Sequence, residues 1–187
     1  MAFQLSGVPE TIMEATFTKG PKPALRAALK AAIKVMNPKG GPRELSDRST
    51  RRWEGLPRST LRPADILVFG WAGGKHACVD LTGVSPLVGL RDNGFVAGQA
   101  ALKAESSKVA KHEKACLENQ HVFIPFAFDT FGFLAPEADE FLNRVQRVVQ
   151  SNFSTPKTQN FIFSRIDFAI QKGVAAQLVA RLSAILL

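Results

Sequence analysis

Two aspartates, Asp65 and Asp80, stand in two short apolar runs that are separated by the pair Gly73-Gly74. Two carboxylates that converge on one point repel each other, and a divalent cation between them relieves the repulsion. Mg²⁺ keeps several waters and binds through one or two carboxylates together with phosphate oxygens of a substrate. The pair therefore predicts phosphodiester chemistry with Mg²⁺ (or Mn²⁺) as cofactor. The alternative is structural, with Asp65 as a strand-entry residue and Asp80 as a solvated position in a strand.

The elements that must position the two acids are predicted to be neighbouring strands. Residues 64–69 are apolar and branched and lie between a proline and a glycine, which indicates a strand. Residues 76–84 have the same character and stop shortly before a second proline. The Gly73-Gly74 pair tolerates the positive φ angles of a tight turn. The two runs therefore predict an antiparallel hairpin with the acids across its ladder.

A helix is expected over residues 97–118, after the hairpin. When it is projected at about 100° per residue, Glu105, Lys108 and His112 fall within its apolar arc. A buried charge without a partner is costly, so this position argues for partners in a site or for snorkelling at its edge. Lys111 lies at the margin of the arc. The alternative is an ordinary surface network of residues three and four apart.

The remaining segments predict the layers around the hairpin. Residues 23–36 form an amphipathic helix whose apolar stripe packs on the sheet. Residues 121–128 form a buried strand, and the proline within it indicates an edge position or a bulge. Residues 136–150 form a helix with acids in its first turn. Residues 160–187 are expected to be helical in two pieces, hinged near Gly173.

Asp129 follows the strand predicted at 121–128. Its carboxylate is expected either to approach the metal site or to cap the turn that begins there, which is the more common use of an aspartate in this position.

Length and composition favour one globular domain. The chain has 187 residues, of which 45% are hydrophobic and 21% charged, and such a chain can bury close to about 70% of its unfolded surface. We expect an arm at residues 1–20 and a single domain at 21–187, with C-terminal helices from about residue 160.

The net charge of +8 is concentrated at the N-terminal end, because residues 1–63 hold 12 Lys and Arg against 5 acids. A basic region beside an acidic centre suits an enzyme that uses a metal ion on a polyanion. The alternative is a solubilising basic loop. Basic residues and one tryptophan could clamp a nucleic-acid backbone and stack on a base. The candidate contacts are Arg48, Arg51, Arg52, Trp53, Arg58, Arg62 and Lys111.

Several other classes of protein have little support. Cys78 and Cys116 lack a CxxC or His-x-His partner, so neither a zinc site nor a disulfide framework is indicated, and both are expected to be buried packing residues. The chain has no Gly-rich phosphate loop and no nucleophile elbow, which argues against a small-molecule enzyme. Without a secretory signal or an apolar stretch long enough to span a bilayer, an intracellular protein is expected, and a nuclear one if DNA is its substrate.

The hairpin motifs resemble those of the PD-(D/E)XK nucleases, in which a Pro-Asp pair on one strand precedes an acid-x-Lys on the next. The matching residues are Pro63-Ala64-Asp65 and Asp80-Leu81-Thr82. The chain from about residue 23 onward is also similar to the module that follows the reverse transcriptase in plant and animal mobile-element proteins. The segments that carry this similarity are RPADILVFGW, ACVDLTGVSPL, AESSKVAKHEKAC, FIPFAFDTFG and SRIDFAIQKGVAAQLVARL.

The resemblance implies a restriction-endonuclease-like α/β fold, with a small mixed sheet flanked by helices. It implies a Mg²⁺-dependent endonuclease acting on DNA, with RNA or a hybrid as the alternative substrate and a reverse transcriptase module as a partner. Asp65 and Asp80 would hold the metal ion, and Glu105 would be a third ligand. Thr82, His112 and Asp129 are expected to be accessory residues.

The chain departs from the parent motif in three places. Thr82 stands where the strand lysine is expected, and the superfamily sometimes replaces that lysine with one from the following helix, here Lys108. No acid occurs from residue 20 to 43, so the first-helix acid has no counterpart, and Lys22-Pro23 stands where the mobile-element modules tend to show Arg-His. These departures leave open a catalytically inactive module that binds nucleic acid or braces a partner domain.

Overall fold

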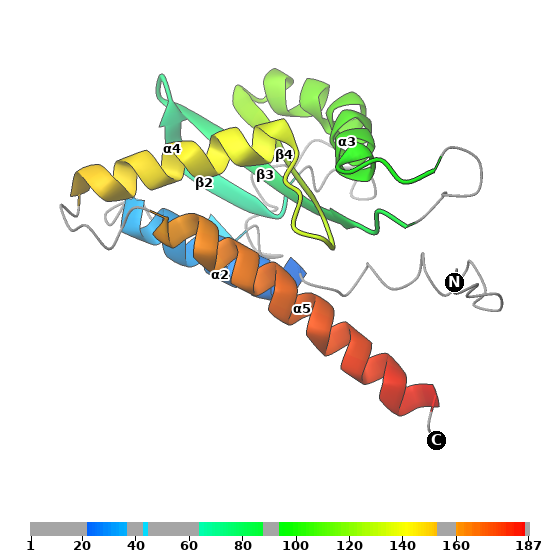
Figure 1. The fold of residues 1–187 in the computed structure, drawn as a ribbon. Coiled ribbons are helices and arrows are strands. Elements are labelled where there is room, and N and C mark those ends of the chain that lie inside the picture. The colour runs from blue at the N-terminus through cyan, green and yellow to red at the C-terminus, as the bar shows by residue number, and fades with distance from the viewer. Residues whose placement is uncertain (1–21, 37–42, 45–63, 88–93, 153–159, 186–187) are drawn as a thin grey trace.

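The computed structural model describes residues 22–36, 43–44, 64–87, 94–152 and 160–185. Within them the chain forms a small mixed α/β fold, as expected (Figure 1). The elements in chain order are α2 (Lys22–Met36), β1 (Arg43–Glu44), β2 (Ile66–Ala72), β3 (Lys75–Val84), α3 (Gln99–Glu118), β4 (His121–Asp129), α4 (Pro136–Asn152) and α5 (Phe161–Ile185). The predicted arm at 1–20 and the predicted contacts from Arg48 to Arg62 lie outside the described residues.

The sheet is built on the predicted hairpin. Strands β2 and β3 pair antiparallel with Ile66 opposite Val79, and the turn between them contains two glycines with positive φ, Gly73 and Gly74. β2 begins and ends later than expected and continues past Gly70. That glycine has a φ of 62° within an irregular stretch of the ladder, so the backbone bulges there instead of ending the strand.

The other strands complete a sheet of order β1-β2-β3-β4. β4 runs parallel to β3 over nine register pairs, from His76 with His121 to Val84 with Asp129, which makes the sheet mixed. β4 is the last strand in this order, and such an edge position tolerates Pro125. The two-residue strand β1 pairs with the start of β2.

Helices cover the sheet unequally on its two faces. The large core lies on the face covered by α2, α4 and α5, whereas α3 lies on the opposite face over β3 and β4 (Figure 1). The apolar stripe of α2 is buried there as predicted. The main core includes Leu25, Leu29, Ile33, Ile66, Val79, Leu81, Phe126, Phe128, Phe141, Leu142, Ile162 and Ile166.

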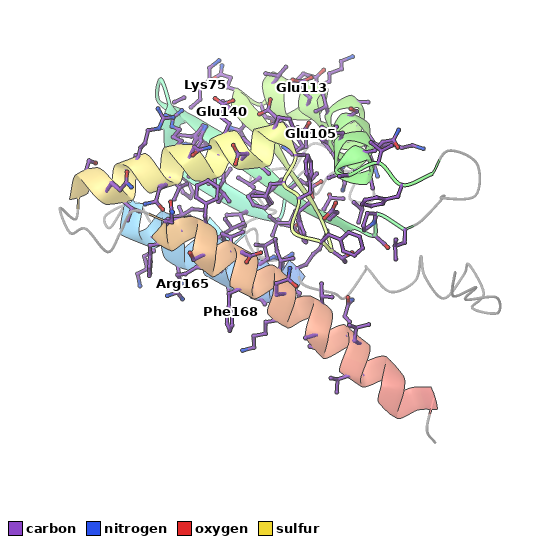
Figure 2. The ribbon with its side chains drawn as sticks, in the orientation of Figure 1. Lys75, Glu105, Glu113, Glu140, Arg165 and Phe168 are labelled. Atoms are coloured by element: carbon purple, nitrogen blue, oxygen red, sulfur yellow. The ribbon has the colours of Figure 1, made fainter. Side chains whose placement is uncertain are left out.

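The last helix differs from the sequence prediction. α5 is one continuous helix from Phe161 to Ile185, so the expected hinge near Gly173 is wrong. A lone glycine costs a helix only about 1 kcal/mol, and its N–H still donates to the preceding turn. Beyond the sheet α5 extends outward (Figure 1), and the exposed Phe168 points away from the body of the molecule (Figure 2).

No helix in the described ranges is both long enough and apolar enough to cross a membrane.

Gly83 lets β3 and β4 pack closely, because a Cβ built at this position lies 2.8 Å from the Phe128 ring. We predict that Gly83→Ala destabilises the fold by about 1–3 kcal/mol through overpacking, and that adding Phe128→Leu recovers part of this loss. Urea unfolding of the two single variants and the double variant checks this. If the double variant loses as much free energy of unfolding as the two single variants together, the Phe128 ring is not what the added methyl group meets.

Candidate functional site

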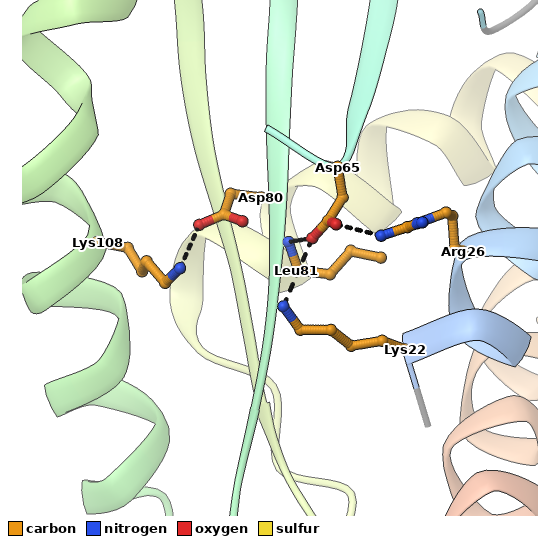
Figure 3. A network of polar contacts seen from close by, with 6 residues as sticks. All are labelled: Lys22, Arg26, Asp65, Asp80, Leu81 and Lys108. Carbon is orange, nitrogen blue, oxygen red and sulfur yellow. Dashed lines mark hydrogen bonds and ion pairs between the residues drawn. The ribbon is translucent and has the colours of Figure 1, made fainter. Parts of the chain in front are cut away.

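Asp80 lies in the middle of β3 and faces α3. The residue is buried, with 6% of its surface exposed, and Lys108 of α3 places its Nζ 2.7 Å from the Asp80 Oδ2 (Figure 3). A carboxylate in such a position needs a nearby positive charge, because burial removes most of its hydration. The structure thus brings together the acid on the strand and the amine on the following helix.

Asp65 lies immediately before β2 and has different partners. Its Oδ1 accepts a hydrogen bond from the Arg26 guanidinium, and its Oδ2 accepts one from the Leu81 N–H at 2.9 Å. The Lys22 Nζ is 3.7 Å from the same Oδ2. Both cations belong to α2, so Asp65 is neutralised from the layer opposite to α3.

The two acids therefore flank one point of β3 without sharing a cation. The Asp65 carboxylate is bonded to the residue that follows Asp80, yet the two carboxylates turn toward different helices (Figure 3). We expected them to converge on one ion. In the described contacts each has its own positive partner, and a divalent cation would have to displace at least one of these ion pairs.

Three residues of α3 at four-residue spacing, Lys108, His112 and Cys116, face strands β3 and β4 of the sheet. Lys108 pairs with Asp80, and the His112 ring centroid lies 5.9 Å from that of Phe123. His112 is 6% exposed, and its Nδ1 is buried without a hydrogen bond from the described residues. Burial lowers the pKa of His112, the Asp80 charge opposes this, and the nearby lysines add to it. The lowered pKa favours the neutral form of the imidazole.

Among the described residues, Glu105 contacts α4 and not the strand acids. Its Oε1 accepts a hydrogen bond from the Glu137 N–H at 3.0 Å, in the first turn of α4. Burial raises the pKa of Glu137, and the negative charges of Glu105, Glu140 and Glu113 raise it further. Figure 2 shows the labelled acids of this group where α3 and α4 approach each other. Glu105 serves the contact between these helices, so its predicted role as a metal ligand has no support from its contacts.

The other candidates occupy separate positions. The Thr82 hydroxyl is buried and has no hydrogen-bond partner within the described ranges; two residues after Asp80 on β3, it lies on the same side of the strand. The Asp129 Oδ1 accepts hydrogen bonds from the N–H groups of Phe131 at 2.8 Å and Phe133 at 3.0 Å. Asp129 therefore caps a turn, the second of the two expectations. Lys111 is exposed on α3.

Sequence reasoning missed two sets of contacts. Lys22 and Arg26 were not connected with Asp65, although their spacing of four places them on one side of the first helix. Cys78 and Cys116 are buried packing residues, as expected, but the sequence did not predict that they lie in one cluster across the β3–α3 contact. No local signal in the sequence indicates that second contact.

A cleft of about 580 Å³ lies elsewhere, between the turn after β4 and α5. Its lining includes Leu134, Phe163, Asp167 and Ile170. None of the predicted site residues contributes to this cleft.

Comparison with known protein families, curated proteins and solved structures found no match. Among the described residues, no group of three or more His, Cys, Asp and Glu side chains could hold a metal ion. The acids and cations around β3 are the candidate site to which both the sequence and the structure point.

The Asp80–Lys108 pair can be tested by a double-mutant cycle. Lys108→Met leaves a buried carboxylate without its cation, so we expect it to lower the free energy of unfolding by up to about 3 kcal/mol. Adding Asp80→Asn should recover most of this loss, because the uncompensated charge is then gone. Urea unfolding at pH 7 measures the four proteins.

Lys111→Met is the matched control, because this exposed lysine lies on the same helix; its effect should stay within about 0.5 kcal/mol. Losses from Lys108→Met and Asp80→Asn that simply add would show that the two groups do not interact.

The lowered pKa of His112 predicts an acid-dependent loss of stability. Below the usual pKa of about 6.5, the unfolded chain binds a proton that the folded chain excludes, so stability is complete above that pH and falls as the pH decreases. His112→Gln should reduce this loss between pH 7 and pH 5. Urea unfolding midpoints in metal-free buffer measure the stability at each pH. If the variant loses as much stability between pH 7 and pH 5 as the wild type, His112 is not the cause of the loss.

Proposed function

We propose that this chain is a nuclease-like domain that acts on DNA phosphodiester bonds with the help of Mg²⁺ or Mn²⁺. The observation that carries the proposal is the buried Asp80 with the Lys108 amine 2.7 Å away. A strand acid with an amine from the following helix is the arrangement implied by the resemblance to PD-(D/E)XK nucleases when the strand lysine is absent. Thr82 stands at that strand position.

The architecture agrees with a restriction-endonuclease-like assignment. A small mixed sheet has helices on both faces, and the acids lie on or beside the two strands of one hairpin. The Asp65 carboxylate also reaches the Leu81 N–H, next to Asp80. The motif residues are thus gathered at one level of the sheet.

The oxygen atoms near Asp80 suit a hard cation. The Thr82 hydroxyl is buried without a hydrogen bond from the described part of the chain, and the nearby Asp80 carboxylate is paired with the Lys108 amine. Mg²⁺ needs only one or two carboxylates beside phosphate oxygens and water. Asp80 and Asp65 are the residues that would hold it. When bound, the ion would acidify a water molecule and neutralise phosphate charge.

The protein's own residues have distinct roles in this proposal. The Lys108 ammonium, held over Asp80, would stabilise the negative charge that develops on the phosphate. Lys22 and Arg26 would exchange Asp65 for phosphate oxygens of the DNA, which frees that carboxylate. Lys111 offers a further, exposed phosphate contact.

A second candidate is a nuclease-like module without catalytic activity, which binds nucleic acid or braces a reverse transcriptase module. The observation that favours it is the state of Asp65, whose two oxygens already contact Arg26, Lys22 and the Leu81 N–H. The first helix thus presents two cations to this acid.

For both candidate functions we propose an origin in a retrotransposon-type element and a nuclear location.

Plasmid nicking distinguishes the two candidates. The wild-type chain with Mg²⁺ or Mn²⁺ should convert supercoiled DNA to the open-circular form, and chelation should stop the reaction. Asp80→Asn should reduce the rate at least about 100-fold because it removes the metal-binding charge, and Lys108→Met should also reduce it strongly. Lys114→Met, an exposed lysine on the same helix, is the control and should leave the rate nearly unchanged.

Salt-dependent DNA binding without cleavage in either metal would select the inactive module. Full activity in Asp80→Asn would remove this site from consideration.

A further inference from the structure

Cys78 and Cys116 are the only two cysteines in the chain. Cys78 lies on β3 and Cys116 on α3, and both residues are completely buried. They belong to one small cluster with Ala64 and Phe123, and each thiol shifts the pKa of the other. Two cysteines that are 38 positions apart in the chain thus lie together where β3 meets α3.

Helix α3 is held on the sheet by few buried side chains. Of its 20 residues, only Ala101, His112 and Cys116 are buried. The Asp80–Lys108 ion pair and the contact between Glu105 and α4 add two polar attachments. A helix with so little buried apolar surface opens locally at low cost, and such an opening admits a small oxidant to both thiols.

We propose that Cys78 and Cys116 form a redox modification site, in which a peroxide converts the thiol pair to a disulfide that joins α3 to β3. The proposal does not depend on nuclease activity.

The reaction has two steps. The Cys116 thiolate attacks one oxygen of hydrogen peroxide; an S–O bond forms, the O–O bond breaks, and the departing hydroxide takes a proton to become water. The Cys78 thiol then loses its proton and attacks the Cys116 sulfur; the S–S bond forms and the sulfenic oxygen leaves as a second water. Two electrons and two protons pass from the thiols to the peroxide.

The positions of the two residues support this order. Cys116 lies in the last turn of α3, where a helix end frays first, whereas Cys78 lies within the paired strand β3. Cys116 is therefore the attacking group and Cys78 the resolving one.

The position of the thiols gives the bond a structural consequence. Cys116 is two helical turns beyond Lys108, and Cys78 precedes Asp80 by two residues, so both pairs lie along one stripe between α3 and β3. A disulfide at one end of this stripe restricts opening of the helix at the other end. The oxidised chain therefore keeps Lys108 over Asp80 more persistently than the reduced chain.

The test oxidises the folded, full-length chain with hydrogen peroxide and measures intact mass and maleimide-reactive thiols. We expect a monomer lighter by two hydrogen atoms, with no reactive thiol, that dithiothreitol restores. Cys78→Ala and Cys116→Ala should each prevent this product. Disulfide-linked dimers, a monomer that only gains oxygen, or no reaction would each overturn the proposal.

Amide hydrogen exchange provides a second readout that needs no variant. On oxidation, exchange in α3 should slow by about tenfold or more, whereas α5, on the opposite face, should change little. Unchanged exchange in α3 of the oxidised monomer would overturn the claim that the bond restrains the helix. Because wild-type protein supplies both readouts, a cysteine variant that fails to fold does not decide the outcome.

Discussion

The burial of a carboxylate in the middle of a strand is the constraint on which the arrangement around β3 depends. Asp80 is almost fully enclosed, so its charge requires a cation from an element that covers the strand. α3 supplies it through Lys108. Because α3 buries few apolar side chains, this ion pair contributes to fixing which face of the helix meets the sheet.

The two faces of the sheet have different roles. The face under α2, α4 and α5 carries an extended apolar core with large side chains such as Phe126 and Phe141, which supplies most of the hydrophobic stabilisation. The face under α3 carries a carboxylate, a hydroxyl and a thiol within a few residues of β3, and α3 adds the imidazole of His112. Polar side chains can be buried on the face under α3 because the apolar core on the other face supplies most of the stability of the fold.

The cations that neutralise the two acids in the free chain also have a role in the proposed function. Lys22, Arg26 and Lys108 neutralise the two acids in the free chain, and the same groups are suited to phosphate. In the proposed function, a polyanion that takes these cations would release the acids beside it. The thiol pair lies on the same α3–β3 stripe, so the persistence of one of these ion pairs is coupled to how firmly α3 is attached.

Local patterns in the sequence determined the hairpin, the amphipathic stripe of the first helix and the inward position of Lys108, because each depends on residues a few positions apart. Only the tertiary structure decided that Asp65 is paired with Lys22 and Arg26, and that the two cysteines share one buried cluster, since these arrangements join segments separated by tens of residues. The continuity of α5 through Gly173 was also decided beyond the local pattern: burial of Ile166 and Ile170 against the core outweighs the small cost of one glycine.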